Sequence, residues 1–293
     1  MIAPAVFWPT AMGCSFLVAG IYTYRRDVFL PSPPSNSRIL ALGPVLIAAS
    51  LAAFAGEHFT AARSLSALVP KWLPARVFIA YFVGAAHTAA ALSLVARRCL
   101  RWSTFLLGVM FALFVLLLHL PGAIANPAFR IAWIVSVRET TFSLGAFAMF
   151  AVVVRGDQPA TEKRLTAAAR FWSAMVIIYF GIEHFLHPKL SPGVPDSQPT
   201  ASWVPLPLAL AYVVGTLLIV FGLSMFVRQY AVRGAKGAGL LMLLLTVVLY
   251  VPQFFLARNV PEHVNAINFI FDTLLFAGTM LVISRAIVLQ PAT

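Results

Sequence analysis

Nine apolar segments limit what this chain can fold into. They cover about residues 3–24, 39–60, 76–96, 102–120, 131–154, 168–187, 204–227, 237–256 and 264–285. Each approaches the ~20 residues that a helix needs to cross about 30 Å of hydrocarbon. Backbone polar groups must be satisfied within the segment at that depth, which favours helices. Only 10% of the residues are charged and 61% are hydrophobic, so we predict an all-α polytopic integral membrane protein with nine transmembrane helices.

The basic residues predict how the chain crosses the lipid bilayer. The formal net charge is +12, yet the basic residues cluster at the ends of apolar segments, as in Arg25-Arg26 and Arg97-Arg98, so no nucleic-acid partner is expected. Placing the N-terminus outside puts most of these clusters in the cytoplasm, and the C-terminus with them. Arg25-Arg26 follow the first apolar segment instead of preceding it, so we interpret that segment as a retained anchor and not as a signal peptide.

The chain also contains an internal duplication. Gly56-Glu57-His58-Phe59 matches Ile182-Glu183-His184-Phe185, and later landmarks match at an offset of 131, such as Trp72 with Trp203. We predict an N-terminal helix with a Pro/Ser linker (1–37), a four-helix repeat (38–155), a linker (156–164) and a second four-helix repeat (165–293). Because each unit has an even number of crossings, the two repeats insert the same way up and are parallel.

Two carboxyl groups lie at matching places inside the apolar segments. The stretch Glu139-Thr-Thr-Phe-Ser-Leu-Gly145 recurs as Asp272-Thr-Leu-Leu-Phe-Ala-Gly278. An acid at the bilayer centre costs about 2.5–3.5 kcal/mol on insertion scales and is often functional. Glu139 could simply pair with Arg138. In the second copy Phe271 replaces that arginine, so Asp272 needs another partner or stays protonated, because burial favours the neutral carboxyl.

Further polar residues gather toward the predicted outer face. We expect the pairs Glu57-His58 and Glu183-His184 to close their helices there, either contacting lipid headgroups or forming, with Arg138, a binding site for a substrate. His119 and its counterpart Tyr250 precede prolines and can exchange protons.

His184 and His187 are spaced as helical metal ligands are, but the first copy has no second histidine, so no metal site is expected. Cys14 and Cys99 form no Cys-x-x-Cys motif and are predicted to be buried free thiols. The chain shows no motif for haem, flavin or an iron–sulfur cluster.

Several of these residues resemble the DoxX-like family of four-helix membrane proteins. The resemblance is carried by Phe54-Ala-Gly-Glu-His-Phe59, by Arg97-Arg98, by His119 and by Arg138-Glu139, and it covers both repeats but not the first helix. It implies a multi-pass protein of the bacterial cytoplasmic (inner) membrane that takes part in redox chemistry. Some relatives look like subunits of quinone-reducing thiosulfate oxidation, and others act with soluble redox enzymes.

Three functions remain open on this basis. The first is a quinone-interacting redox subunit with an outward-facing pocket, in which Glu139, Asp272, His119 and Tyr250 act on the quinone head and a soluble or membrane redox partner supplies electrons. The second is a transporter that couples a small solute to protons through the two acids. The third is a non-catalytic scaffold or assembly factor, in which the acids only join helices by hydrogen bonds.

Overall fold

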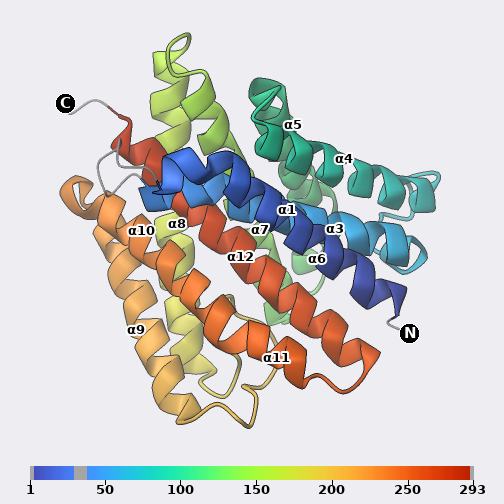
Figure 1. The fold of residues 1–293 in the computed structure, drawn as a ribbon. Coiled ribbons are helices and arrows are strands. Elements are labelled where there is room, and N and C mark those ends of the chain that lie inside the picture. Colours follow the sequence, from blue (N-terminus) through green and yellow to red (C-terminus); the bar gives the residue numbers. More distant parts are fainter. Residues whose placement is uncertain (1–2, 30–37, 291–293) are drawn as a thin grey trace.

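The computed structural model describes residues 3–29 and 38–290, which form a helical bundle (Figure 1). The helices are α1 (Pro4–Phe29), α3 (Leu42–Leu65), α4 (Arg76–Ala96), α5 (Leu100–Phe114), α6 (Leu120–Ala125), α7 (Arg130–Val153), α8 (Pro159–Leu186), α9 (Pro207–Phe226), α10 (Arg228–Leu245), α11 (Val251–Leu256) and α12 (Val260–Val288). The described residues contain no strand, only an isolated bridge between Leu190 and Pro199. The predicted Pro/Ser linker lies outside the described residues at 30–37.

The structure confirms the predicted membrane fold. Eight helical stretches are long and apolar enough to cross a bilayer, counting Leu100–Ala125 and Arg228–Leu256 as one stretch each. The remaining long helix is α7, whose mean hydropathy is lowered by Arg138 and Glu139. With α7, the described part of the chain has nine long helical stretches.

Several helices extend further than their apolar segments. Helix α8 starts at Pro159, so much of the predicted linker 156–164 is helical, because proline is favoured in the first turn of a helix. Helix α12 starts with a side-chain N-cap: Asn259 Oδ1 accepts the Glu262 N–H at 2.9 Å, and the Glu262 carboxylate accepts from Asn259 Nδ2 at 2.7 Å. Helix α3 continues to Leu65, so Glu57-His58 lie inside it and not at its end.

Local geometry recurs at the matched positions of the two repeats. Ala75 and Leu206, which precede α4 and α9, have φ values of +50° and +48°. A short stretch of π-helix, which we call a π-turn, follows α5 at Val115–His119, and another follows α10 at Thr246–Tyr250. Each lies just before the helical turn that carries a proline. The four-helix units therefore share backbone irregularities as well as sequence, as a duplication predicts.

The repeats interlock through their first and last helices. Helix α3 packs against α12, and α7 packs against both α8 and α12, while α4 with α5 and α9 with α10 lie on opposite flanks (Figure 1). Gly43 and Gly278 permit the α3–α12 crossing, because a Cβ on Gly278 would lie 2.8 Å from the Gly43 carbonyl oxygen. Such small residues let membrane helices approach closely.

The extra helix α1 lies along α3 and α12. Gly20 faces Val45, and a Cβ there would come within 2.7 Å of that side chain, while Gly13 makes the corresponding close approach to the Phe271 ring. Cys14, next to Gly13, is exposed, and so is Cys99. The prediction that both thiols are buried is therefore wrong: Cys14 lies on an exposed face of α1, and Cys99 lies in the connection between α4 and α5.

We name the two ends of the bundle by what they carry. The loop end holds the segment 187–206 between α8 and α9 and is the end predicted to lie outside. The basic end holds Arg97 after α4 and Arg285 in the last turn of α12.

Candidate functional site

The two predicted acids meet at one arginine. Arg138 Nη1 donates to Asp272 Oδ2 at 2.7 Å, and Arg138 Nη2 lies 3.3 Å from Glu139 Oε1. The three side chains are 17%, 23% and 11% exposed, in the order Arg138, Asp272 and Glu139. The partner that Asp272 lacks in its own repeat is thus supplied by the other repeat.

The helices explain why this pairing crosses between repeats. Helices α7 and α12 contact each other in the middle of the bundle. The position in α12 that matches Arg138 is Phe271, and its ring packs on Gly13 of α1. At 1.5 Å per residue, Asp272 lies about 18 Å into α12 and Glu139 about 14 Å into α7, well below the loop end.

Glu57 adds a third carboxyl group to this cluster. Its side chain hydrogen-bonds Asn268 and interacts electrostatically with Asp272. Asn268 lies one turn before Asp272 and therefore on the same face of α12. Sequence reasoning missed Asn268 and Asn265, although their spacing of four and seven residues from Asp272 was a usable signal. We call Arg138, Glu139, Asp272 and Glu57 the Arg138 centre.

A polar cavity of about 100 Å³ adjoins this centre. Its lining residues are Arg138, Val194, Pro195, Asp196, Gln198, Asn265, Asn268, Phe269, Asp272 and Thr273. Arg138 Nε and Thr273 Oγ1 are buried there without a hydrogen-bond partner among the described residues. Since buried polar atoms are normally satisfied, these two are available to a bound ligand or water.

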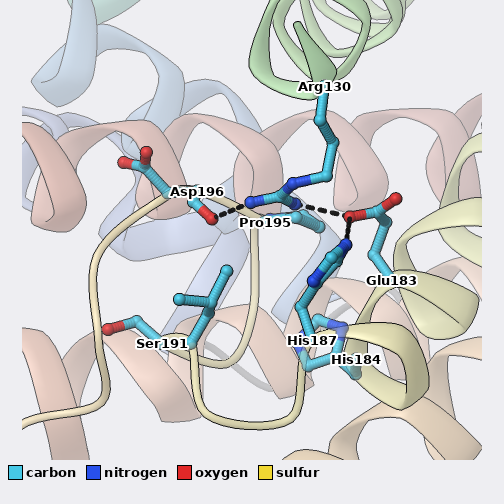
Figure 2. A pocket seen from close by; sticks show the side chains of 8 residues that line it. Arg130, Glu183, His184, His187, Ser191, Pro195 and Asp196 are labelled. Carbon is cyan, nitrogen blue, oxygen red and sulfur yellow. Dashed lines mark hydrogen bonds and ion pairs between the residues drawn. The ribbon is translucent and has the colours of Figure 1, made fainter. Parts of the chain in front are cut away.

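A second arginine of α7 forms a separate network nearer the loop end (Figure 2). Arg130 Nη1 lies 2.5 Å from Glu183 Oε2, and Arg130 Nη2 donates to the Asp196 carbonyl oxygen at 2.6 Å. His187 Nε2 lies 4.0 Å from the same Glu183 oxygen. We call Arg130, Glu183 and His187 the Arg130 centre. Glu57 and Glu183 occupy matched positions in the repeats, yet they belong to different centres.

The side chains of the predicted histidines His58 and His184 form hydrogen bonds with backbone groups. His184 Nε2 accepts the Gly193 N–H at 2.8 Å, and its Nδ1 lies 2.5 Å from the Phe180 carbonyl oxygen. Both ring nitrogens are therefore occupied in a neutral tautomer, which leaves none for a metal. His58 Nδ1 contacts the Ala80 carbonyl oxygen at 2.9 Å. Neither histidine lines the cavity.

His187 does not share a helical face with His184 as predicted. Helix α8 ends at Leu186, and His187 has the non-helical angles φ −129° and ψ 56°. The chain turns there into segment 187–206, so the spacing of three residues no longer places the two rings one above the other.

The structure separates the other two predicted proton donors. Tyr250 is buried, stacks on Phe269 with ring centroids 5.1 Å apart and donates its hydroxyl to the Pro192 carbonyl oxygen. It therefore fastens segment 187–206 beside the cavity and does not reach Asp272. His119 lies in the π-turn after α5 and interacts electrostatically with Arg138.

The wall of the cavity at the loop end comes from one segment. Val194, Pro195 and Asp196 belong to segment 187–206, and Pro195 and Asp196 also adjoin the Arg130 centre. Comparison of the chain with known protein families, curated proteins and solved structures gives no match. The DoxX-like resemblance therefore stays a prediction, and the function has to be argued from the Arg138 centre and its cavity.

Proposed function

We propose that this protein is a proton-coupled transporter for a small polar solute that carries a positive charge, either a cation or a zwitterion. The observation that supports this most is the composition of the Arg138 centre: one guanidinium pairs with Asp272 and Glu139 beside a polar cavity, and a third carboxyl group, Glu57, interacts with Asp272. Asp196 adds another carboxylate to the lining.

Charge balance points to the class of solute. Burying an unpaired ion costs several kcal/mol, so the centre holds protons when empty and exchanges them for a positively charged group. An anionic solute would meet Asp196 and Asp272 and be repelled. The amide side chains of Asn265, Asn268 and Gln198 provide further donors and acceptors that orient the solute.

The place of the cavity supports transport. Arg138 and Glu139 come from the first repeat, and Asp272 and most of the lining come from the second. Transporters built from internal repeats bind their solutes between the repeats, where a movement of one repeat against the other opens either side. Intramembrane acids in such proteins commonly relay protons.

Quinone binding, the first hypothesis from the sequence, has less support. A cavity of 150 Å³ lined by apolar groups accommodates benzene, whereas this cavity has about 100 Å³ and mostly polar walls. A substituted quinone ring is larger than benzene. The hydroxyl of Tyr250 is bonded to Pro192, so only Glu139 and Asp272, with His119 nearby, remain at the centre.

A flux experiment tests the proposal. The protein is reconstituted into liposomes that contain a pH-sensitive dye, and solutes smaller than benzene, such as glycine and ethanolamine, are added outside. We expect one of these classes to drive proton movement in the wild type and Asp272→Asn to abolish it. Asp157→Asn is the control, because Asp157 is exposed and pairs only loosely with Arg101, at 3.6 Å.

Two outcomes contradict the proposal. One is the absence of solute-driven proton flux with all of these cationic and zwitterionic probes. The other is flux that persists unchanged in Asp272→Asn. Competition by a quinone analogue for a ligand bound near Arg138 would instead favour the redox function.

A further inference from the structure

A second cavity lies at the basic end of the bundle, far from the Arg138 centre along the helices. It has a volume of about 120 Å³ and is lined by residues of α1, α3, α4, α5, α7 and α12. Its walls are mainly apolar and include Leu94, Met149, Val152 and Val282. Among the described residues, two arginines, Arg97 and Arg285, are the only charged ones that line it.

The positive charge of this cavity is only partly neutralised. Arg97 pairs with Asp27 at 2.9 Å and lies over the Tyr24 ring, 4.5 Å from its centroid. Arg285 interacts electrostatically with Tyr24. No carboxylate among the described residues lies within ion-pair distance of Arg285. The Tyr24 hydroxyl is occupied, because it donates to the Leu94 carbonyl oxygen at 3.1 Å. The guanidinium of Arg285 is thus the group left for an anion.

The position of the cavity matches the level of lipid headgroups. Arg97 directly follows the last residue of α4, and Arg285 lies in the last turn of α12. Trp102, at the same end, is 67% exposed, as tryptophans at the membrane interface commonly are. Val153 lines the cavity and is 41% exposed, so the cavity has an apolar side that faces the surrounding lipid.

We propose that this cavity binds an anionic phospholipid, whose phosphate lies between Arg97 and Arg285 and whose acyl chain leaves along Met149 and Val153. Basic pockets between membrane helices recognise anionic headgroups in this way. The lipid joins α1, through Tyr24, and the end of α4, through Arg97, to α7 of the first repeat and α12 of the second. It therefore stabilises the attachment of the extra helix.

Lipid binding is measured by native mass spectrometry of the detergent-purified full chain with phosphatidylglycerol or phosphatidylcholine. We expect phosphatidylglycerol to bind at least tenfold more tightly than phosphatidylcholine. Arg285→Gln should remove most of this preference. Arg98→Gln is the matched control, because Arg98 is exposed at the same end and does not line the cavity.

A second variant separates binding from folding. Val153→Trp fills the apolar side and keeps both arginines, so it should also weaken phosphatidylglycerol binding while the protein still elutes as a single species. Inorganic phosphate is added as a competitor, to distinguish a site for a phospholipid headgroup from a site for free phosphate.

Three results would overturn the proposal: equal binding of the two lipids, equal losses in Arg285→Gln and Arg98→Gln, or displacement of phosphatidylglycerol by millimolar inorganic phosphate, which would show a site for the free anion. None of these measurements depends on the transport assay, so either proposal can fail alone.

Discussion

The Arg138 and Arg130 centres are both built on an arginine–carboxylate pair, but they differ in the number of carboxyl groups and in the volume of the adjoining cavity. In each, an arginine of α7 pairs with a carboxylate of the second repeat, Asp272 in one and Glu183 in the other. The Arg138 centre has three carboxyl groups and a cavity of about 100 Å³. The Arg130 centre has one carboxylate, a backbone carbonyl and a space of about 10 Å³, which is about enough for one water. The additional carboxyl groups and the larger cavity distinguish a site that can bind a ligand, the Arg138 centre, from one that holds a loop in place, the Arg130 centre.

The largest effect is expected from Arg138→Gln. The change leaves Asp272 and Glu139 without their cation, and loss of one partner of a buried ion pair costs about 3–5 kcal/mol. The free energy of unfolding in detergent should fall by that amount at neutral pH. The loss should shrink as the pH is lowered, because protonated carboxyls no longer repel one another.

The double variant Arg138→Gln/Asp272→Asn provides the control for this first prediction. It removes one of the acids together with the arginine and should recover part of the stability. If the two single changes and the double change add without any recovery, Arg138 and Asp272 do not act as a pair.

A smaller loss is expected from Arg130→Gln. Glu183 then loses its arginine, and hydrogen bonds to charged groups contribute about 1.5–3 kcal/mol. The Glu183 side chain is 6% exposed and that of Arg130 is 24% exposed, so water replaces part of the interaction. Solute-driven proton flux should persist at a reduced rate. Complete loss of flux in this variant would show that the two centres work as one.

Replacing the matched histidines sharpens the comparison between repeats. His184→Ala leaves the Gly193 N–H without its acceptor and should cost about 1–2 kcal/mol. It should also speed the cleavage of segment 187–206 by an added protease. His58→Ala removes one contact to a carbonyl and should leave cleavage of this segment unchanged, so equal cleavage rates in both variants would refute the difference in role.

The smallest effect is expected from Tyr250→Phe. The ring can still stack on Phe269, and only the hydrogen bond to the Pro192 carbonyl is lost, at a cost of about 1 kcal/mol. Proton flux should remain within about twofold of the wild type if Tyr250 only fastens the segment. A loss of proton flux as large as that expected in Asp272→Asn would show that Tyr250 takes part in proton transfer.

The sequence predicted the helices well because a bilayer imposes length and hydropathy on each of them. It also picked out Glu139 and Asp272, because two acids in apolar segments are costly. It could not predict that Arg138 serves Asp272, because that pairing depends on the rotation of α7 against α12. Glu57 was assigned to a helix end since the apolar run stops there, whereas α3 continues to Leu65.

Segment 187–206 was the least predictable part. Its residues show little periodicity, yet residues 191–195 are buried and the segment is hydrogen-bonded to α8, to α7 and to the π-turn after α10. Such contacts join places that lie 9, 66 and 58 residues apart. No local pattern carries this information.

The fastening of this segment also determines how it can open. Ser191 and Thr200 donate their N–H groups within the segment, to the Gln198 and Lys189 carbonyl oxygens, and the Gly193 amide is held by His184. Amides closed by one set of mutually dependent bonds exchange their hydrogens together. Deuterium uptake at Ser191, Gly193 and Thr200 should therefore give one common opening free energy after correction for intrinsic exchange, and that value measures how often this wall of the cavity opens.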